Sequence, residues 1–216
     1  MQRQLSKMLL QGAKTWPGMI TVGMIAAVIA AAPAAAPLAA QDTSSLAGQK
    51  HSSAVGHLDV AVTYNSTLSN ITSGSSFWMR GGSVEVEGRF YRGLGAVADI
   101  AGMHAANINA TGVGLDLIMA TFGPRYTWSR HRYEFYGQGL VGEVWGMNGI
   151  FPNPAGANTV ADSMAVEAGS GLNVTLSPHL ALRAFQANWL RTQLPNNASN
   201  VQNNLRLGAG FVFRFR

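Results

Sequence analysis

Residues 202–216 read QNNLRLGAGFVFRFR, and this stretch decides the fold. From Leu205 onward, apolar side chains occupy every second position and end in three phenylalanines. The positions between them include Arg206 and Arg214. A period of two residues predicts a β-strand, because successive side chains of a strand point to opposite faces of a sheet. The stretch therefore predicts a final strand with aromatic side chains on one face and arginines on the other.

Seven earlier segments alternate in the same way, which predicts eight strands in all. These segments are 57–65, 83–91, 94–100, 119–128, 133–141, 163–176 and 180–189. The last of them keeps its polar side chains together only if a β-bulge lies near Phe185. Short turns are expected at 91–94, 129–132 and 177–180, and longer polar links at 66–76, 104–114, 146–162 and 193–203. This alternation in length places all long links at one end of an antiparallel meander.

The polar faces of the predicted strands carry acidic and basic side chains in nearly equal number. They are Asp59, Glu85, Glu87, Arg89, Asp99, Arg125, Glu134, Glu167, Arg183, Arg206 and Arg214. A water-facing sheet would use lysine freely, yet Lys50 is the only lysine beyond residue 40. Nearly balanced arginine and carboxylate indicate an ion-paired interior, because unpaired charge is costly away from water.

These faces predict an all-β fold: a closed, antiparallel, eight-stranded up-and-down transmembrane β-barrel whose apolar side contacts lipid. Eight strands enclose an interior that side chains can fill, and closure satisfies the backbone hydrogen-bonding groups. The alternative is a secreted soluble β-barrel, which would bury the apolar face and expose the polar face to water. An ion-paired interior within a narrow lumen favours the membrane barrel.

Aromatic residues are expected to form two girdles at the two membrane interfaces. Near the short turns lie Phe90, Tyr91, Tyr126, Trp128, Tyr133, Phe135, Phe213 and Phe215. Near the long links lie Trp78, Trp145, Phe151 and Trp189.

The N-terminus has the composition of a secretory signal peptide. Basic residues Arg3, Lys7 and Lys14 precede the apolar run 19–36, which predicts cleavage before Gln41. A membrane anchor is the alternative interpretation of this run. The predicted organisation is a signal peptide over 1–40, a short flexible leader over 41–55 and the barrel over 56–216.

Composition limits the classes of function. Removal of residues 1–40 leaves 12 basic residues against 10 acidic ones, and no basic cluster predicts a nucleic-acid partner. The chain contains no cysteine, so disulfides cannot stabilise it outside the cytoplasm. No metal-ligand, phosphate-binding or nucleotide-binding motif occurs, so neither a cofactor nor an enzyme activity is expected.

The combination of a signal peptide, eight strands and a terminal Phe-x-Phe-x-Phe resembles the small OmpA-type outer-membrane β-barrels. The stretches FGPRYTW (122–128) and LRLGAGFVFRF (205–215) resemble strand segments of that family. The resemblance covers roughly 57–216. It implies a bacterial outer-membrane location with both termini in the periplasm, and contact with the lipid bilayer and lipopolysaccharide. It also implies insertion by the barrel-assembly machinery, which would read Phe211, Phe213 and Phe215, although Arg216 follows the last of these.

Three functions fit such a barrel. The first is a structural or surface-interaction role for a monomer whose long links are extracellular. The second is a narrow pore lined by Glu85, Glu87, Arg89 and Asp99, although the near balance of acidic and basic side chains favours a lumen blocked by ion pairs. The third is a lipid A–modifying enzyme, which requires a reactive Ser or His at the lipid interface. Among the five histidines, His104 alone is expected at the long-link end, and no serine or carboxylate partner is evident.

Overall fold

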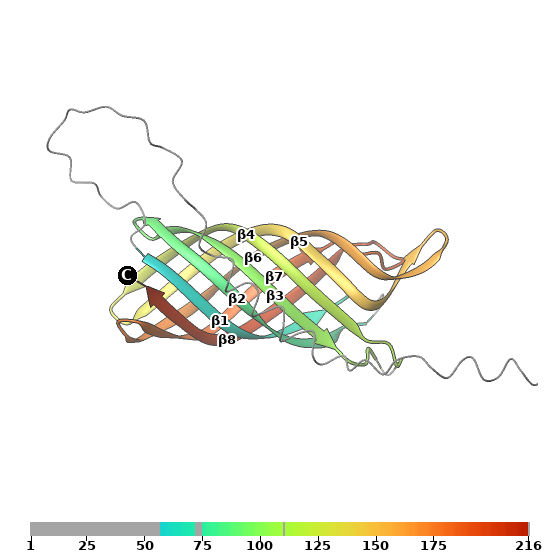
Figure 1. Ribbon diagram of the computed structural model, residues 1–216, viewed down its shortest axis with the longest axis horizontal. Helices are drawn as coiled ribbons and strands as arrows, with labels where there is room; N and C mark the ends of the chain where they lie inside the picture. The colour runs from blue at the N-terminus through green and yellow to red at the C-terminus, as the bar shows by residue number, and fades with distance from the viewer. Residues whose placement is uncertain (1–56, 72–74, 110, 216) are drawn as a thin grey trace, which may run out of the picture. The chain divides into compact units, whose positions relative to one another are not determined.

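The computed structural model describes residues 57–71, 75–109 and 111–215, which form a barrel of eight strands (Figure 1). The strands are β1 (His57–Ser69), β2 (Phe77–Tyr91), β3 (Leu94–Ala105), β4 (Leu115–Arg130), β5 (Tyr133–Asn153), β6 (Gly156–Ser177), β7 (Leu180–Thr192) and β8 (Gln202–Phe215). The predicted signal peptide and leader, and Arg216, lie outside the described residues. In these three ranges, no helix is long and apolar enough to cross a membrane.

Each strand pairs in antiparallel fashion with the next one along the chain, and β1 also pairs with β8. The final strand closes the barrel, with Phe213 opposite Val60 and Arg214 opposite Asp59. Figure 1 shows the strands running obliquely around the barrel axis. Closure removes the free edges of the wall, so backbone N–H and C=O groups there are paired between strands. The predicted closed antiparallel eight-stranded barrel is confirmed.

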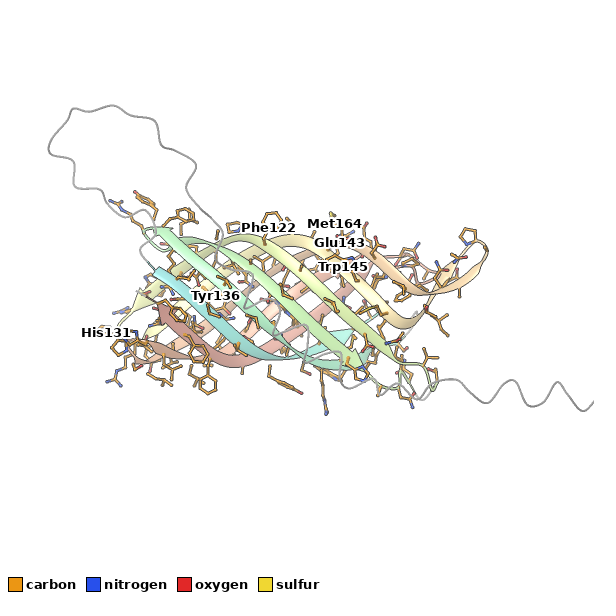
Figure 2. The ribbon with its side chains drawn as sticks, in the orientation of Figure 1. Phe122, His131, Tyr136, Glu143, Trp145 and Met164 are labelled. Carbon is orange, nitrogen blue, oxygen red and sulfur yellow. The ribbon has the colours of Figure 1, made fainter. Side chains whose placement is uncertain are left out.

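Side chains alternate between the outside and the inside of the wall. Outside, large apolar side chains are exposed, including Phe122 at 65% and Phe215 at 56%. Inside, Asp99 and Arg206 are completely buried. In Figure 2, Phe122 lies on the outer surface, whereas Tyr136, which is buried, lies within the barrel. This arrangement suits an apolar solvent, and it is the reverse of the soluble alternative.

The connections differ in length at the two ends of the barrel. Two-residue turns over 92–93, 131–132 and 178–179 join β2 to β3, β4 to β5 and β6 to β7. We call this the turn end. Longer links join β1 to β2, β3 to β4 and β7 to β8 at the opposite, loop end, over 70–76, 106–114 and 193–201.

The predicted long link over 146–162 is wrong, because most of it is strand. β5 continues to Asn153 and β6 begins at Gly156, so the connection between them is only two residues long. The hairpin extends beyond the loop ends of the other strands (Figure 1). On β6, residues 156–164 are exposed or half-buried on both faces, so this part of the sequence lacks the apolar–polar alternation that marks a strand in the barrel wall. On β5, buried and exposed side chains still alternate as far as Phe151.

The predicted bulge near Phe185 is confirmed. The β7–β8 register shifts between Arg183 and Gln186, and Ala184 and Phe185 both face outward. Because two consecutive side chains point out, Arg183 and Gln186 both point into the interior.

Candidate functional site

The interior from the turn end to the middle of the barrel contains all of the charged side chains assigned above to the polar faces. Each of them takes part in at least one ion pair. The side chains are Asp59, Glu85, Glu87, Arg89, Asp99, Arg125, Glu134, Glu167, Arg183, Arg206 and Arg214. They form three clusters, and an ion pair of 3.1 Å between Nη1 of Arg125 and Oε2 of Glu87 joins the first to the third.

Glu85 on β2 is the centre of the first cluster and accepts hydrogen bonds from two arginines. Its Oε2 atom lies 2.6 Å from Nη2 of Arg125 and 2.6 Å from Nη1 of Arg183. Gln186, turned inward by the bulge, donates to Oε1 at 2.8 Å. The ring of Tyr136 lies 4.2 Å from Cζ of Arg125 and 5.1 Å from Cζ of Arg183. Cation–π contact therefore adds to the ion pairs.

Arg206 on β8 forms the second cluster by bridging two carboxylates. Its Nη2 atom donates to Asp99 at 2.6 Å and to Glu167 at 2.7 Å. Asn188 also donates to Glu167. In this cluster one arginine faces two carboxylates. In the first cluster the arrangement is reversed, because the single carboxylate of Glu85 faces two arginines. The two clusters together are therefore neutral, which limits the cost of burying six charges.

The third cluster lies at the turn end and links four strands. Arg89 contacts Asp59, Glu87 and Glu134, and its Nε lies 2.9 Å from a Glu87 carboxylate oxygen. Arg214 donates to Glu134 at 2.6 Å. The acidic residues on β1, β2 and β5 thus meet arginines from β2 and β8. Each of these interior carboxylates thus pairs with at least one arginine, while Oδ1 of Asp99 and Oε2 of Glu167 accept no hydrogen bond from the described residues.

The loop half of the interior is mainly apolar, which the sequence analysis did not predict. Buried apolar side chains from six strands and three links form a cluster there: Ile71, Phe77, Met79, Ala101, Met103, Ala105, Ile108, Leu115, Leu117, Met119, Val144, Phe151, Ala165, Leu190 and Leu194. The polar side chains buried there lie on β1, β7 and β8: Thr67, Ser69, Thr192, Gln202 and Asn204. Thr67 donates a hydrogen bond to the sulfur of Met103 at 3.0 Å. Apolar residues occupy both faces of β4 here, so the alternation in sequence could not distinguish inside from outside.

The outer surface carries the predicted aromatic side chains, with two differences at the loop end. Trp78, Phe90, Tyr126, Trp128, Phe135 and Trp189 are exposed. Trp128 and Phe135 pair across β4 and β5, with ring centroids 6.0 Å apart. Trp145 is only half-buried against the wall, and Phe151 is wrongly assigned to the girdle because it packs into the interior. Gly146 and Gly149 leave the space that its ring occupies.

Neither a protein-family model nor a curated protein sequence matches the chain. Solved structures do match. Ail, the attachment invasion locus protein of Yersinia pestis, is 17% identical, with 74% of this chain and 99% of that chain covered and a TM-score of 0.50. Ail in complex with the heparin analogue sucrose octasulfate matches at 18% identity, with 74% and 98% covered and a TM-score of 0.50. Neisserial surface protein A is 14% identical, with 74% and 99% covered and a TM-score of 0.55.

The chain has the fold of the eight-stranded outer-membrane β-barrels. The resemblance to the small OmpA-type barrels is thereby confirmed at the level of fold. In this outer-membrane barrel fold, Phe211, Phe213 and Phe215 all point outward from β8, with exposed fractions of 48%, 43% and 56%. Their side chains are therefore accessible from outside the barrel wall.

His104 has a carboxylate partner that the sequence analysis missed. On the outer surface near the loop end, its Nδ1 atom lies 2.5 Å from Asp116 Oδ1, and Asn148 donates to the other oxygen. The pairing of β3 with β4 places His104 directly opposite Asp116. Ser66 lies on the same cross-strand row, but Arg80 on β2 lies between it and His104. The pair therefore lacks an adjacent serine nucleophile on that row.

Metal coordination finds no support in the described ranges. Among residues 57–71, 75–109 and 111–215, no group of three or more His, Cys, Asp or Glu side chains could hold a metal ion.

Proposed function

We propose that the chain is a bacterial outer-membrane barrel protein with a structural or surface-interaction role. In this proposal, residues 1–40 direct export, both termini and the turn end face the periplasm, and the loop end faces outward. The observation that carries the proposal is the combination of an exposed apolar outer surface with a fully ion-paired interior. Such a surface is unfavourable in water and favourable in lipid.

The test is gel mobility of the protein folded into detergent or lipid, with and without boiling. A folded barrel is compact and resists detergent, so we expect the unboiled sample to migrate faster than the boiled one. Equal mobility of a sample with β-sheet circular dichroism would contradict the membrane barrel.

The β5–β6 hairpin is the element best suited to a surface interaction. Pairing of β5 with β4 ends at Met147, and pairing of β6 with β7 ends at Ala165. Residues 148–164 thus form a two-stranded ribbon with unpaired backbone groups along both edges. Ile150 and Val160 expose 62% and 56% of their surface on this ribbon. Free edges with exposed apolar side chains favour pairing with an extended partner segment.

A shortened hairpin tests this role without disturbing the barrel. Phe151 and Asn158 are cross-strand partners, so residues 152–157 can be replaced by an Asn-Gly turn while Phe151 stays in the interior. The shortened hairpin keeps Ile150 and Val160, so both are also changed to Thr. We expect bacteria that display this barrel to lose adhesion to cultured cells, while the heat-dependent mobility shift remains. Unchanged adhesion would remove the hairpin from the proposal.

We further propose that the barrel is neither a pore nor an enzyme. Ion pairs occupy the interior from the turn end to the middle, and an apolar cluster with a few buried polar side chains beside it occupies the loop half. The lipid A–modifying alternative requires a nucleophile, and the His104–Asp116 pair has none beside it. An unchanged lipid A mass after expression is the expected result, and an altered mass would contradict it.

A further inference from the structure

Exposed charges on the outside of the barrel are divided between its two ends. Among the described residues, the exposed ionisable groups of the three turns and their flanks are all basic: Arg92, Arg130, His131, Arg132 and His179. We call these five residues the basic collar. The described acidic side chains that are not buried inside the barrel, Asp116, Glu143 and Asp162, lie toward the loop end. Figure 2 shows His131 and Glu143 well apart along the barrel axis, with His131 at the turn end.

Two arginines of the basic collar lie beside aromatic rings of the outer surface. The guanidinium carbon of Arg92 lies 5.3 Å from the ring centroid of Tyr91. Arg130 is the cross-strand partner of Tyr133. The next outward-facing pair toward the middle of the barrel is Trp128 and Phe135. Tyr and Trp side chains on the outside of a membrane protein are enriched at headgroup depth, so arginines beside Tyr91, Tyr133 and Trp128 are expected at the same depth or just beyond it.

The turns hold the basic collar close to this depth. Each turn has two residues, and Arg92 and His131 adopt positive φ values of 40° and 57° in them. Compact turns of this kind cannot extend a side chain far from the end of the barrel. The collar can therefore reach the phosphate groups of adjacent lipids but not a distant layer of the cell envelope.

We propose that the basic collar binds the phosphate groups of anionic phospholipids in the leaflet that surrounds the turn end. This proposal rests on the proposed function, since it requires a barrel inserted in a bilayer. Guanidinium groups bind phosphate through paired hydrogen bonds and keep their charge at all relevant pH values. Each arginine near an anionic membrane surface favours binding by about fivefold. At the loop end, Arg80 and Arg191 share the surface with acidic groups, so we expect no such preference there.

Tryptophan quenching by brominated lipids can measure local enrichment at each end. The full chain is folded into nanodiscs with Trp128 as its only tryptophan, the others being replaced by Phe. Quenching by phosphatidylglycerol with brominated acyl chains is compared with quenching by phosphatidylcholine carrying the same chains. A second form retains only Trp189, near the loop end. We expect about a fivefold preference for phosphatidylglycerol around Trp128 and no preference around Trp189.

Matched variants connect the preference to the arginines. We expect Arg92→Gln/Arg130→Gln to lower the preference at Trp128, because Arg132 is then the one arginine left in the basic collar. The control Arg80→Gln/Arg191→Gln removes the same charge from the loop end and should retain the preference. Inorganic phosphate should compete no better than chloride at equal ionic strength, because the collar binds lipid-borne phosphate rather than the free ion. Displacement specific to inorganic phosphate would overturn the assignment to lipid.

The outcomes separate this proposal from the proposed function. Heat-dependent gel mobility is measured on the same nanodisc samples. A barrel that shows the mobility shift without a lipid preference at Trp128 overturns the collar proposal alone. A preference that is unchanged in Arg92→Gln/Arg130→Gln also overturns the collar proposal alone. Absence of the shift overturns the membrane barrel itself.

Discussion

Among single residues, the buried arginines that form ion pairs with two carboxylates contribute strongly to holding the barrel together. Arg206 is fully buried and joins Asp99 to Glu167 across the lumen. Asp99 and Glu167 are themselves fully buried, so water cannot compensate their charges if Arg206 is removed. The residue is therefore a stabilising cross-link between β3, β6 and β8.

We expect Arg206→Gln to lower the free energy of unfolding by about 3–5 kcal/mol, because it leaves buried carboxylates without a counter-charge. The control Arg191→Gln changes an exposed arginine and should stay within about 0.5 kcal/mol of the parent. Urea titration in detergent or lipid, followed by tryptophan fluorescence, measures both values. Equal effects of the two substitutions would show that the interior pairs contribute nothing to stability.

Close approach between β4 and β5 gives a second residue-scale prediction. A Cβ atom on Gly123 would lie 2.1 Å from the carbonyl oxygen of Gly139, whereas a Cβ on Gly139 would meet no atom within 4 Å. We expect Gly123→Ala to destabilise the barrel by about 1–3 kcal/mol and Gly139→Ala to have little effect. The midpoint of thermal unfolding distinguishes them, and the opposite order would contradict the packing described.

At the scale of elements, the β5–β6 hairpin combines a projecting tip with an anchoring side chain. Phe151 belongs to the apolar cluster, while the residues beyond it are exposed or half-buried. The strand pair can therefore change at its tip without affecting the barrel, provided that Phe151 remains.

We expect Phe151→Ala to lower the free energy of unfolding by about 3 kcal/mol, because it opens a cavity in the apolar half of the interior. The shortened hairpin that retains Phe151 should unfold with nearly the parental free energy. Denaturant titration of the three proteins checks this order. A large loss of stability in the shortened hairpin would mean that its tip also supports the barrel.

At the scale of the whole molecule, the two halves of the interior differ in chemistry but both are filled. Ions would have to separate buried ion pairs and then cross an apolar layer that contains Met79, Leu117 and Met119. Burial of an unpaired ion in such a layer is strongly unfavourable.

We therefore expect no stepwise ionic current from the folded protein in planar bilayers. Glu85→Gln and Arg89→Gln should also be silent, because neither variant removes the apolar layer. A current in the parent that changes with either substitution would favour the narrow pore instead.

Local sequence is enough to predict the number of strands, their antiparallel order and which face of each strand points outward. These features follow from a two-residue alternation and from connection lengths, both of which are local properties of the chain. The predicted bulge at Phe185 was equally local, since one extra residue was needed to keep the polar side chains of that strand together.

Only the tertiary structure decided which charges pair, where the interior becomes apolar and how far β5 and β6 extend. Arg183 and Glu85 are distant in sequence, and they meet because closure places β7 and β2 on opposite sides of a narrow lumen. The sequence did not reveal the apolar part of the interior because both faces of β4 are apolar near Leu117. It did not reveal the full length of the hairpin because residues 156–164 are exposed or half-buried on both faces. Alternation reports a side chain's surroundings only where a strand separates two different solvents, and the barrel wall provides that separation along only part of its length.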